Sequence, residues 1–200
     1  MSSAAQGMRR CSPIIVRTCA WRNSFHALRS LSSTHQPEIR GTLPMGGVGV
    51  VIDQYAEAKR IYTQEDVNSY GQLVGDMNPL HQRWSKSEIP SNVEHHPLLA
   101  WDDDDEESTK PIVHGMLVSG LFSCIFGSLI PGAVYLKQSL DFRKPVYVDI
   151  LVVARVTVTA VRQTRRKGLI VTCDTHVFSQ DQECVRGEAN VWIPVSKEQL

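Results

Sequence analysis

One apolar stretch restricts the folds open to this chain more than any other part of the sequence. It runs from Ile112 to Ile130, and it predicts a helix from about Gly115 to Leu129 that Pro131-Gly132 ends. The helix is apolar nearly all round, so it must be buried on every side rather than along one face. Because glycines, serines and His114 interrupt the stretch, it predicts the central helix of a protein core and not a membrane span.

The pattern of apolar residues changes to a period of two after this helix. Four β-rich runs follow, AVYLKQSLDF, VYVDILVVARVTVTAV, GLIVTCDTHVF and CVRGEANVWIPV, separated by short polar connections. Before the helix, Val48–Ile52 (VGVVI) is a short β-prone run, and Tyr62–Gly75 favours a second helix. This order predicts an α+β fold in which a curled antiparallel sheet surrounds one central buried helix.

The sequence marks both ends of the second helix. Thr63 is a candidate N-cap residue, and Asp66 three residues later completes a capping pattern. Gly75 can adopt the left-handed backbone that ends many helices. Asp76 is therefore expected in a loop directly after the helix.

That loop holds a candidate acid–base pair. In LVGDMNPLHQR, Asp76 lies five positions before His81, and Pro79 fixes the backbone between them. A carboxylate and an imidazole that share one water form a competent acid–base pair near neutral pH, and Asn78 could orient either group by hydrogen bonding. The spacing fits equally a helix end followed by an Asn-Pro turn with no catalytic role, so spacing alone leaves both interpretations open.

The segment from Trp84 to Lys110 is polar and includes the acidic run DDDDEE from Asp102 to Glu107. This composition predicts a mobile surface insertion, at about residues 90–109, that buries no core. Adjacent acidic residues do not supply the converging ligands that a hard metal ion requires, so no metal site is expected there.

The first 37 residues differ from the rest of the chain in charge. They contain five arginines, many serines and no acidic residue, whereas all 21 Asp and Glu side chains follow. This bias is typical of an organelle transit peptide, expected here at residues 1–40 and directed to the mitochondrial matrix. A basic tail that binds an anionic partner is the alternative. The remainder is expected to form a single net acidic domain at residues 46–198, with no nucleic-acid partner.

Two motifs together resemble those of a known family. YGQLVGDMNPLH and, further along, PIVHGMLVSGLFS are similar to the paired motifs of the MaoC-like (R)-specific hydratases and dehydratases, which have the hotdog fold. The resemblance extends from about Tyr55 to Val195. It implies reversible dehydration of (R)-3-hydroxyacyl thioesters to trans-2-enoyl thioesters. Together with the leader, it implies that this reaction serves mitochondrial type II fatty acid synthesis.

The resemblance also implies roles for individual residues. The catalytic pair of the family falls on Asp76 and His81, and supporting residues fall on Asn78 and Ser123. The backbone N–H of Gly115, at the start of the central helix, corresponds to the donor that polarises the thioester carbonyl. His114 is interpreted as structural. The resemblance implies no metal, no other cofactor and a homodimer.

Other functions remain open on the same fold, because a fold alone does not determine a reaction. One is an (R)-specific enoyl-CoA hydratase of β-oxidation, although the C-terminal KEQL is not a peroxisomal signal of the S-K-L type. Another is a thioesterase, and a third is a non-catalytic hotdog accessory protein of the organelle. The intact acid–base pair argues against the last. The sequence leaves open whether acyl carrier protein or CoA carries the substrate.

A basic turn is a candidate contact for that carrier. RQTRRKG places four cations in an expected hairpin loop: Arg162, Arg165, Arg166 and Lys167. Arg143 and Lys144 add positive charge in a neighbouring connection. Such a patch would attract the acidic acyl carrier protein or the phosphate of the pantetheine arm, whereas an ordinary solvated turn is the alternative.

A fluorescent reporter fused behind residues 1–45 is expected to enter mitochondria, because an arginine-rich and acid-free leader is typical of imported proteins. Cleavage is expected between about Arg29 and Arg40. Microscopy of cells that express the fusion checks the destination. A diffuse cytosolic signal would contradict the transit peptide, and a plastid signal would correct the organelle.

Overall fold

A computed structural model gives the fold of the protein and describes residues 36–102, 104–105, 107–164 and 168–194. His35–Leu200 forms one compact unit by its internal contacts. The leader predicted at residues 1–40 lies outside the described residues except for residues 36–40. Within the described residues, no helix is long and apolar enough to cross a membrane.

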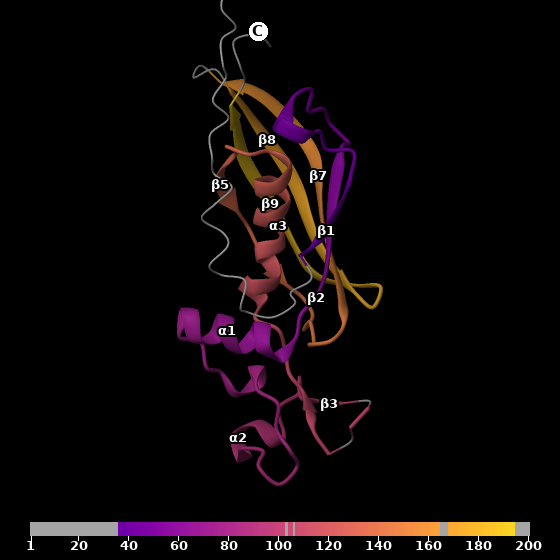
Figure 1. The fold of residues 1–200 in the computed structure, drawn as a ribbon, viewed down its shortest axis with the longest axis vertical. Helices are drawn as coiled ribbons and strands as arrows, with labels where there is room; N and C mark the ends of the chain where they lie inside the picture. Colours follow the sequence, from indigo (N-terminus) through magenta and orange to yellow (C-terminus); the bar gives the residue numbers. More distant parts are fainter. Residues whose placement is uncertain (1–35, 103, 106, 165–167, 195–200) are drawn as a thin grey trace, which may run out of the picture. The chain divides into compact units, whose positions relative to one another are not determined.

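An antiparallel sheet forms the frame of this unit (Figure 1). Its strands follow the order β1-β2-β7-β8-β9-β5, and the short β6 pairs with β9. The strands are β1 (Glu38–Gly41), β2 (Tyr55–Ile61), β5 (Val134–Gln138), β6 (Asp141–Phe142), β7 (Leu151–Thr164), β8 (Gly168–Ser179) and β9 (Gln182–Pro194). Each of the four β-rich runs predicted after the central helix therefore contributes to the sheet.

The central helix α3 (Gly115–Leu129) has the predicted bounds and lies along one face of the sheet (Figure 1). Its side chains Phe122 and Ile125 are fully buried. The predicted burial on every side is wrong, because Met116, Gly120 and Ser123 lie on an exposed face of the helix. On the strand β7, which packs against α3, burial alternates along the chain: Val152, Ala154, Val156 and Val158 are buried, and the residues between them are more exposed. Burial of each large apolar side chain contributes roughly 1.5–3 kcal/mol, so this interface forms the core.

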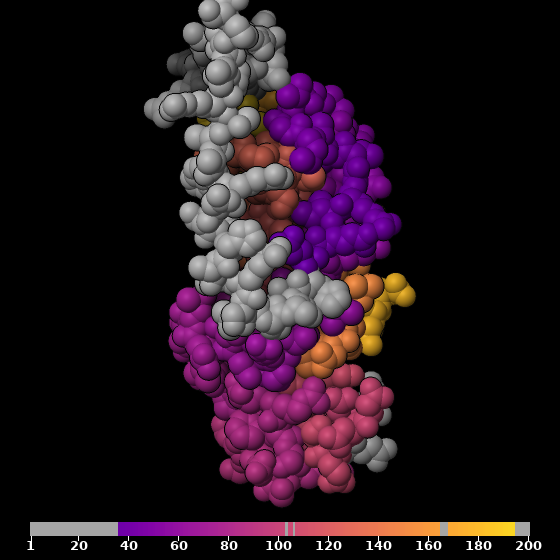
Figure 2. All heavy atoms as spheres, viewed as in Figure 1, coloured from indigo at the N-terminus to yellow at the C-terminus, as the bar shows by residue number. Residues whose placement is uncertain are grey.

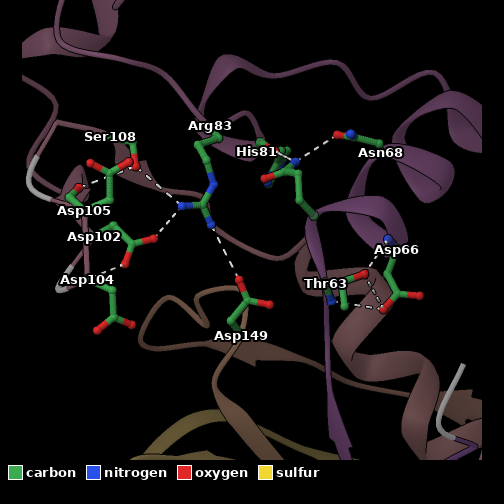
Figure 3. Close-up of polar contacts among 11 residues, drawn as sticks. Thr63, Asp66, Asn68, His81, Arg83, Asp102, Asp104, Asp105, Ser108 and Asp149 are labelled. Atoms are coloured by element: carbon green, nitrogen blue, oxygen red, sulfur yellow. Dashed lines mark hydrogen bonds and ion pairs between the residues drawn. The ribbon is translucent and has the colours of Figure 1, made fainter. Parts of the chain in front are cut away.

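Helix α1 (Gln64–Val74) begins and ends at the predicted residues. The N–H of Asp66 donates to Thr63 Oγ1 at 3.2 Å, and the N–H of Thr63 donates to Asp66 Oδ2 at 3.0 Å, which confirms the capping box (Figure 3). Gly75 ends the helix in the left-handed conformation, with φ of 80°. In Figure 1, α1 lies across the end at which α3 begins, and this places the loop after α1 beside the start of the buried helix.

The predicted strand at Val48–Ile52 is wrong. The strand that joins the sheet is β2, which starts at Tyr55, and Val50 alone of the predicted run is buried. Gly47 and Gly49 both have positive φ, a conformation that glycine adopts readily and that an extended strand does not contain. The β-branched valine and isoleucine side chains of this run predicted a strand, but the backbone conformation of the glycines prevents one.

The acidic segment is folded, contrary to the predicted mobile insertion. It contains the short helix α2 (Ser91–Glu94) and a small sheet in which β3 (Ala100–Trp101) pairs with β4 (Thr109–Lys110). Val93 is buried within it. We call residues 84–110 the lobe, and Figure 2 shows its described atoms, magenta to pink, packed together below α1.

An arginine beside the lobe ties it to the main sheet. Arg83 donates to the Asp102 carboxylate of the lobe, and its second terminal nitrogen lies 3.5 Å from Asp149 Oδ2, shortly before β7 (Figure 3). Part of the acidic run is therefore paired with a cation that precedes it in the chain. Arg83 lies outside residues 90–109, so the composition of this segment gave no sign of the ion pair and predicted a solvated loop.

The first strand changes the predicted start of the domain. β1 pairs with β2 from Glu38 opposite Lys59 to Gly41 opposite Ala56. The sheet therefore begins before residue 46, the start expected from the sequence. If the leader is removed, a cut before Glu38 is the one that keeps this edge strand whole.

Candidate active site

The loop after α1 shapes the first half of the site. Asp76 Oδ1 accepts the N–H of Asn78 at 3.3 Å, and Asn78 Oδ1 accepts the N–H of Leu80 at 3.0 Å. Pro79–His81 then forms one short 3₁₀ turn. Asn78 therefore acts on the backbone, and it fixes the turn that separates the acidic side chain from the histidine.

Asp76 and His81 face each other across this turn. His81 Nε2 lies 3.8 Å from Asp76 Oδ2, a distance too long for a direct hydrogen bond and suited to a water or substrate group between the two. His81 Nδ1 lies 2.7 Å from the carbonyl oxygen of Ile112. Because a carbonyl oxygen only accepts, Nδ1 carries the proton, and Nε2 presents its lone pair toward the carboxylate.

The surroundings of His81 keep its ring neutral near pH 7. Burial lowers the pKa of His81 from 6.5, since it removes water from the cation. The hydrogen bond to Ile112 and the Asp76 carboxylate oppose this decrease. A neutral imidazole with a free Nε2 lone pair can accept a proton.

A second histidine belongs to the same group. The ring of His114 stacks on that of His81 with centroids 3.7 Å apart, and His114 Nε2 lies 3.1 Å from the backbone oxygen of Asp76. The side chain is 3% exposed. The interpretation of His114 as structural considered only its place before the central helix, and its spacing of two residues from Ile112 gave no sign that it reaches the loop after α1.

Among the described residues, Asp76, His81 and His114 bring one ligand atom each within 4.8 Å of one another, close enough to suggest a metal site. The ring planes of the two histidines differ by only 28°. His114 Nε2 donates to the backbone oxygen of Asp76, so this nitrogen has no lone pair to offer an ion. The geometry favours a catalytic group over a metal centre, and the absence of a metal from the reaction stays a prediction.

A cavity of about 360 Å³ opens beside His81 and Gly115. Its wall is apolar, and it consists mainly of buried Val113, Val118, Val146 and Val185, with the more exposed Leu98, Met116 and Phe142. Arg143 and Lys144 also line it. An apolar cavity with a few polar groups suits a ligand that has a hydrocarbon chain and a polar reacting end.

Gly115 offers this cavity a backbone donor. It is the first residue of α3, and the side chain of its N-cap residue His114 makes no capping hydrogen bond. The first N–H groups of a helix have no partner within the helix and lie at the positive end of its dipole. A Cβ atom at Gly115 would lie 2.6 Å from the ring of Phe142, so this ring would have to move if residue 115 carried a side chain.

The predicted supporting residue Ser123 lies away from this group. It is exposed on α3, two turns beyond Gly115, and it does not line the cavity. A different serine of the helix, Ser119, is buried and donates to the backbone oxygen of Gly115 at 2.8 Å. Within the described residues, Ser119 is thus the serine in contact with the start of α3.

Arg162, the described member of the predicted basic turn, is remote from the cavity. Arg162 lies near the far end of β7, roughly 36 Å from Leu151 at a strand rise of about 3.3 Å per residue, and it pairs with Ile170 in register. The cavity lies at the Leu151 end, where Asp149 N donates to Tyr62 O. Three other members of the predicted patch, Arg165, Arg166 and Lys167, lie outside the described residues.

Comparison with known proteins gives relatives that this chain matches over most of their length. A mitochondrial 3-hydroxyacyl-[acyl-carrier-protein] dehydratase of Arabidopsis thaliana is 34% identical over 142 residues, which are 68% of this chain and 72% of that protein. An (R)-specific enoyl-CoA hydratase of Aeromonas caviae is 35% identical over 153 residues, which are 75% of this chain and all of that protein. No family model matches the chain.

A solved structure agrees with these sequence matches. The (R)-hydratase of A. caviae involved in PHA biosynthesis superposes with a TM-score of 0.58 at 34% identity, over 73% of this chain and 98% of that one. The similarity therefore extends through both segments that form the site, the loop after α1 and the start of α3.

Proposed function

This chain belongs to the MaoC-like family of (R)-specific hydratases and dehydratases and has its hotdog fold, and from this premise we propose that it interconverts (R)-3-hydroxyacyl thioesters and trans-2-enoyl thioesters. The enzyme is a hydro-lyase. The proposal rests mainly on one observation. His81 Nε2 faces the Asp76 carboxylate beside an apolar cavity whose wall includes a helix N-terminus.

In the dehydration direction, the thioester carbonyl makes the proton on C2 acidic. The oxygen of that carbonyl gains negative charge as the proton leaves, and the N–H of Gly115 would stabilise it, since donors aimed at developing charge lower the barrier. The Asp76–His81 pair accepts the C2 proton and supplies a proton to the departing C3 hydroxyl, so water leaves and the pair returns to its starting state. Which of the two groups makes each transfer is left to the pair as a unit.

The setting we propose is type II fatty acid synthesis in the mitochondrial matrix. Two features support it: a relative named as mitochondrial acts on acyl-carrier-protein substrates, and residues 1–37 contain five arginines without an acidic residue. The alternative is an (R)-specific enoyl-CoA hydratase, which the second relative supports. Turnover of (R) and (S) substrates of several chain lengths on both carriers separates the two.

Asp76→Asn and His81→Ala are each expected to lower kcat by two or more orders of magnitude, the scale seen when a positioned acid or base is removed. Both side chains lie at a loop, so thermal unfolding should change little. His95→Ala is the matched control, because His95 is an exposed histidine of the lobe that does not line the cavity. Activity like that of the unmodified enzyme in either folded variant of the pair would refute the mechanism.

The cations beside the cavity are expected to contact the carrier arm. Lys144 Nζ donates to the neutral Gln182 Oε1 at 2.8 Å, whereas Arg143 is paired with Asp141 and Glu183. Lys144→Glu should therefore raise KM for the acyl-carrier-protein substrate severalfold at low salt and spare a short thioester without the phosphate.

Arg162→Glu serves as the control for this variant and also tests the basic turn predicted from the sequence. It makes the same charge change at the other end of β7. A rise in KM from Arg162→Glu, with none from Lys144→Glu, would place carrier docking at the turn instead.

A homodimer is expected in solution. β1 and β5 end the described sheet with unpaired backbone edges, and Val134 and Leu136 of β5 are 48% and 52% exposed. Pairing of an edge with a second copy would cover both the backbone and these side chains. Light scattering of the purified protein at micromolar concentration should give twice the chain mass, and a monomer alone would contradict the dimer.

A further inference from the structure

His114 contacts both members of the catalytic pair without facing the cavity. It is the N-cap residue of α3, its side chain is 3% exposed, and the cavity wall includes its neighbours Val113 and Gly115 but not His114 itself. A histidine in this place has no access to substrate. Its contacts with the loop after α1 therefore need a different explanation.

The protonation of His114 follows from its partners. Nε2 lies 3.1 Å from the backbone oxygen of Asp76, which only accepts, so Nε2 carries a proton and donates it. Nδ1 is buried and has no hydrogen-bond partner. Of the two ring nitrogens of His114, Nε2 therefore makes the hydrogen bond to the loop after α1.

The ring also restrains His81. Its face lies against the His81 ring at 3.7 Å between centroids, and Tyr70 of α1 lies 5.1 Å from the centroid of His114. The edge of His81 is held by the hydrogen bond from Nδ1 to Ile112. One contact fixes the plane of His81 and the other fixes its rotation within that plane.

The packing leaves no room for this arrangement to shift. Gly71 lies on α1 beneath the same group, and a Cβ atom there would lie 2.8 Å from the backbone oxygen of Asp76 and 3.5 Å from His114 Nε2. The absence of a side chain at residue 71 lets α1 approach the oxygen that His114 binds. The position of Asp76 thus depends on contacts from two sides.

We propose that His114 is a positioning residue that sets the separation of Asp76 and His81, by a hydrogen bond to the backbone of the first and a ring stack on the second. The inference rests on the proposed function. It assigns a role in turnover to a buried side chain that touches no substrate.

His114→Phe keeps the buried ring and removes the donor, so Asp76 loses its anchor. We expect kcat to fall by about tenfold to a hundredfold, since misplacement of a catalytic group by about 1 Å has effects of this size. KM should stay within about twofold because the cavity is unchanged. His114→Gln, whose amide nitrogen can reach the place of Nε2, should recover part of kcat, whereas the shorter His114→Asn should not.

Gly71→Ala tests the same role without altering His114. Alanine favours a helix interior over glycine by about 1 kcal/mol, so a loss of kcat cannot be ascribed to a weakened helix. We expect a lower kcat at unchanged KM, because the new methyl group displaces the Asp76 oxygen. Gly120→Ala on α3 is the matched control, since a Cβ atom there meets nothing within 4 Å.

The outcomes separate this inference from the proposed function. If the unmodified enzyme turns over no (R)-3-hydroxyacyl thioester, the function is wrong. If it is active and His114→Phe or Gly71→Ala retains full kcat, the positioning role is wrong. A merely structural role would lower the unfolding temperature while the folded fraction kept its kcat, and if no His114 variant folds, the kcat of Gly71→Ala decides.

Discussion

The central helix α3 has to bury a wide apolar face, and this requirement arranges much of the protein. Most of its apolar side chains, including Phe122 and Ile125, are buried, whereas an exposed stripe runs along the opposite face through Gly120 and Ser123. At its first residue, Gly115, backbone N–H groups meet an apolar cavity. The buried residues around the start of α3 thus form the apolar wall of the cavity. The N-terminus of α3 places partial positive charge in that wall. The catalytic loop had to form where this helix begins.

Backbone atoms join the two segments of the site. Ile112 N donates to Leu80 O at 2.9 Å, and Ile112 O accepts from His81 Nδ1. His114 donates to the backbone oxygen of Asp76. Each contact has a main-chain carbonyl or N–H on at least one side, and the rings of His81 and His114 supply the other side in two of them. The alignment of the reacting groups therefore depends both on how the two segments pass each other and on these two rings.

The sequence predicted those parts of the fold that local rules determine. The capping pattern at Thr63 and Asp66, the glycine end at Gly75 and the bounds of α3 all depend on residues close in the chain, and the structure confirms them. Failures arose where a distant partner decided the result. Asp102 of the acidic run is paired with Arg83, which also contacts Asp149, and the contacts of His114 cross from one motif to the other. At Val48–Ile52, glycines with left-handed backbone outweighed β-prone side chains. The remote place of Arg162 required the length and register of β7, which composition does not give.

The lobe connects the two segments of the site, and its ends are fastened together independently of its length. The N–H of Trp84 donates to Thr109 Oγ1, and the N–H of Thr109 donates to Trp84 O. These two bonds follow in the chain on the contact between Leu80 and Ile112. A loop whose ends are held together in this way can lengthen at small cost, since the entropy lost on loop closure grows only with the logarithm of loop length. The lobe is therefore a site where inserted sequence is expected to be tolerated. An inserted binding segment would lie only a few residues from His81 and would leave the residues of the active site unchanged.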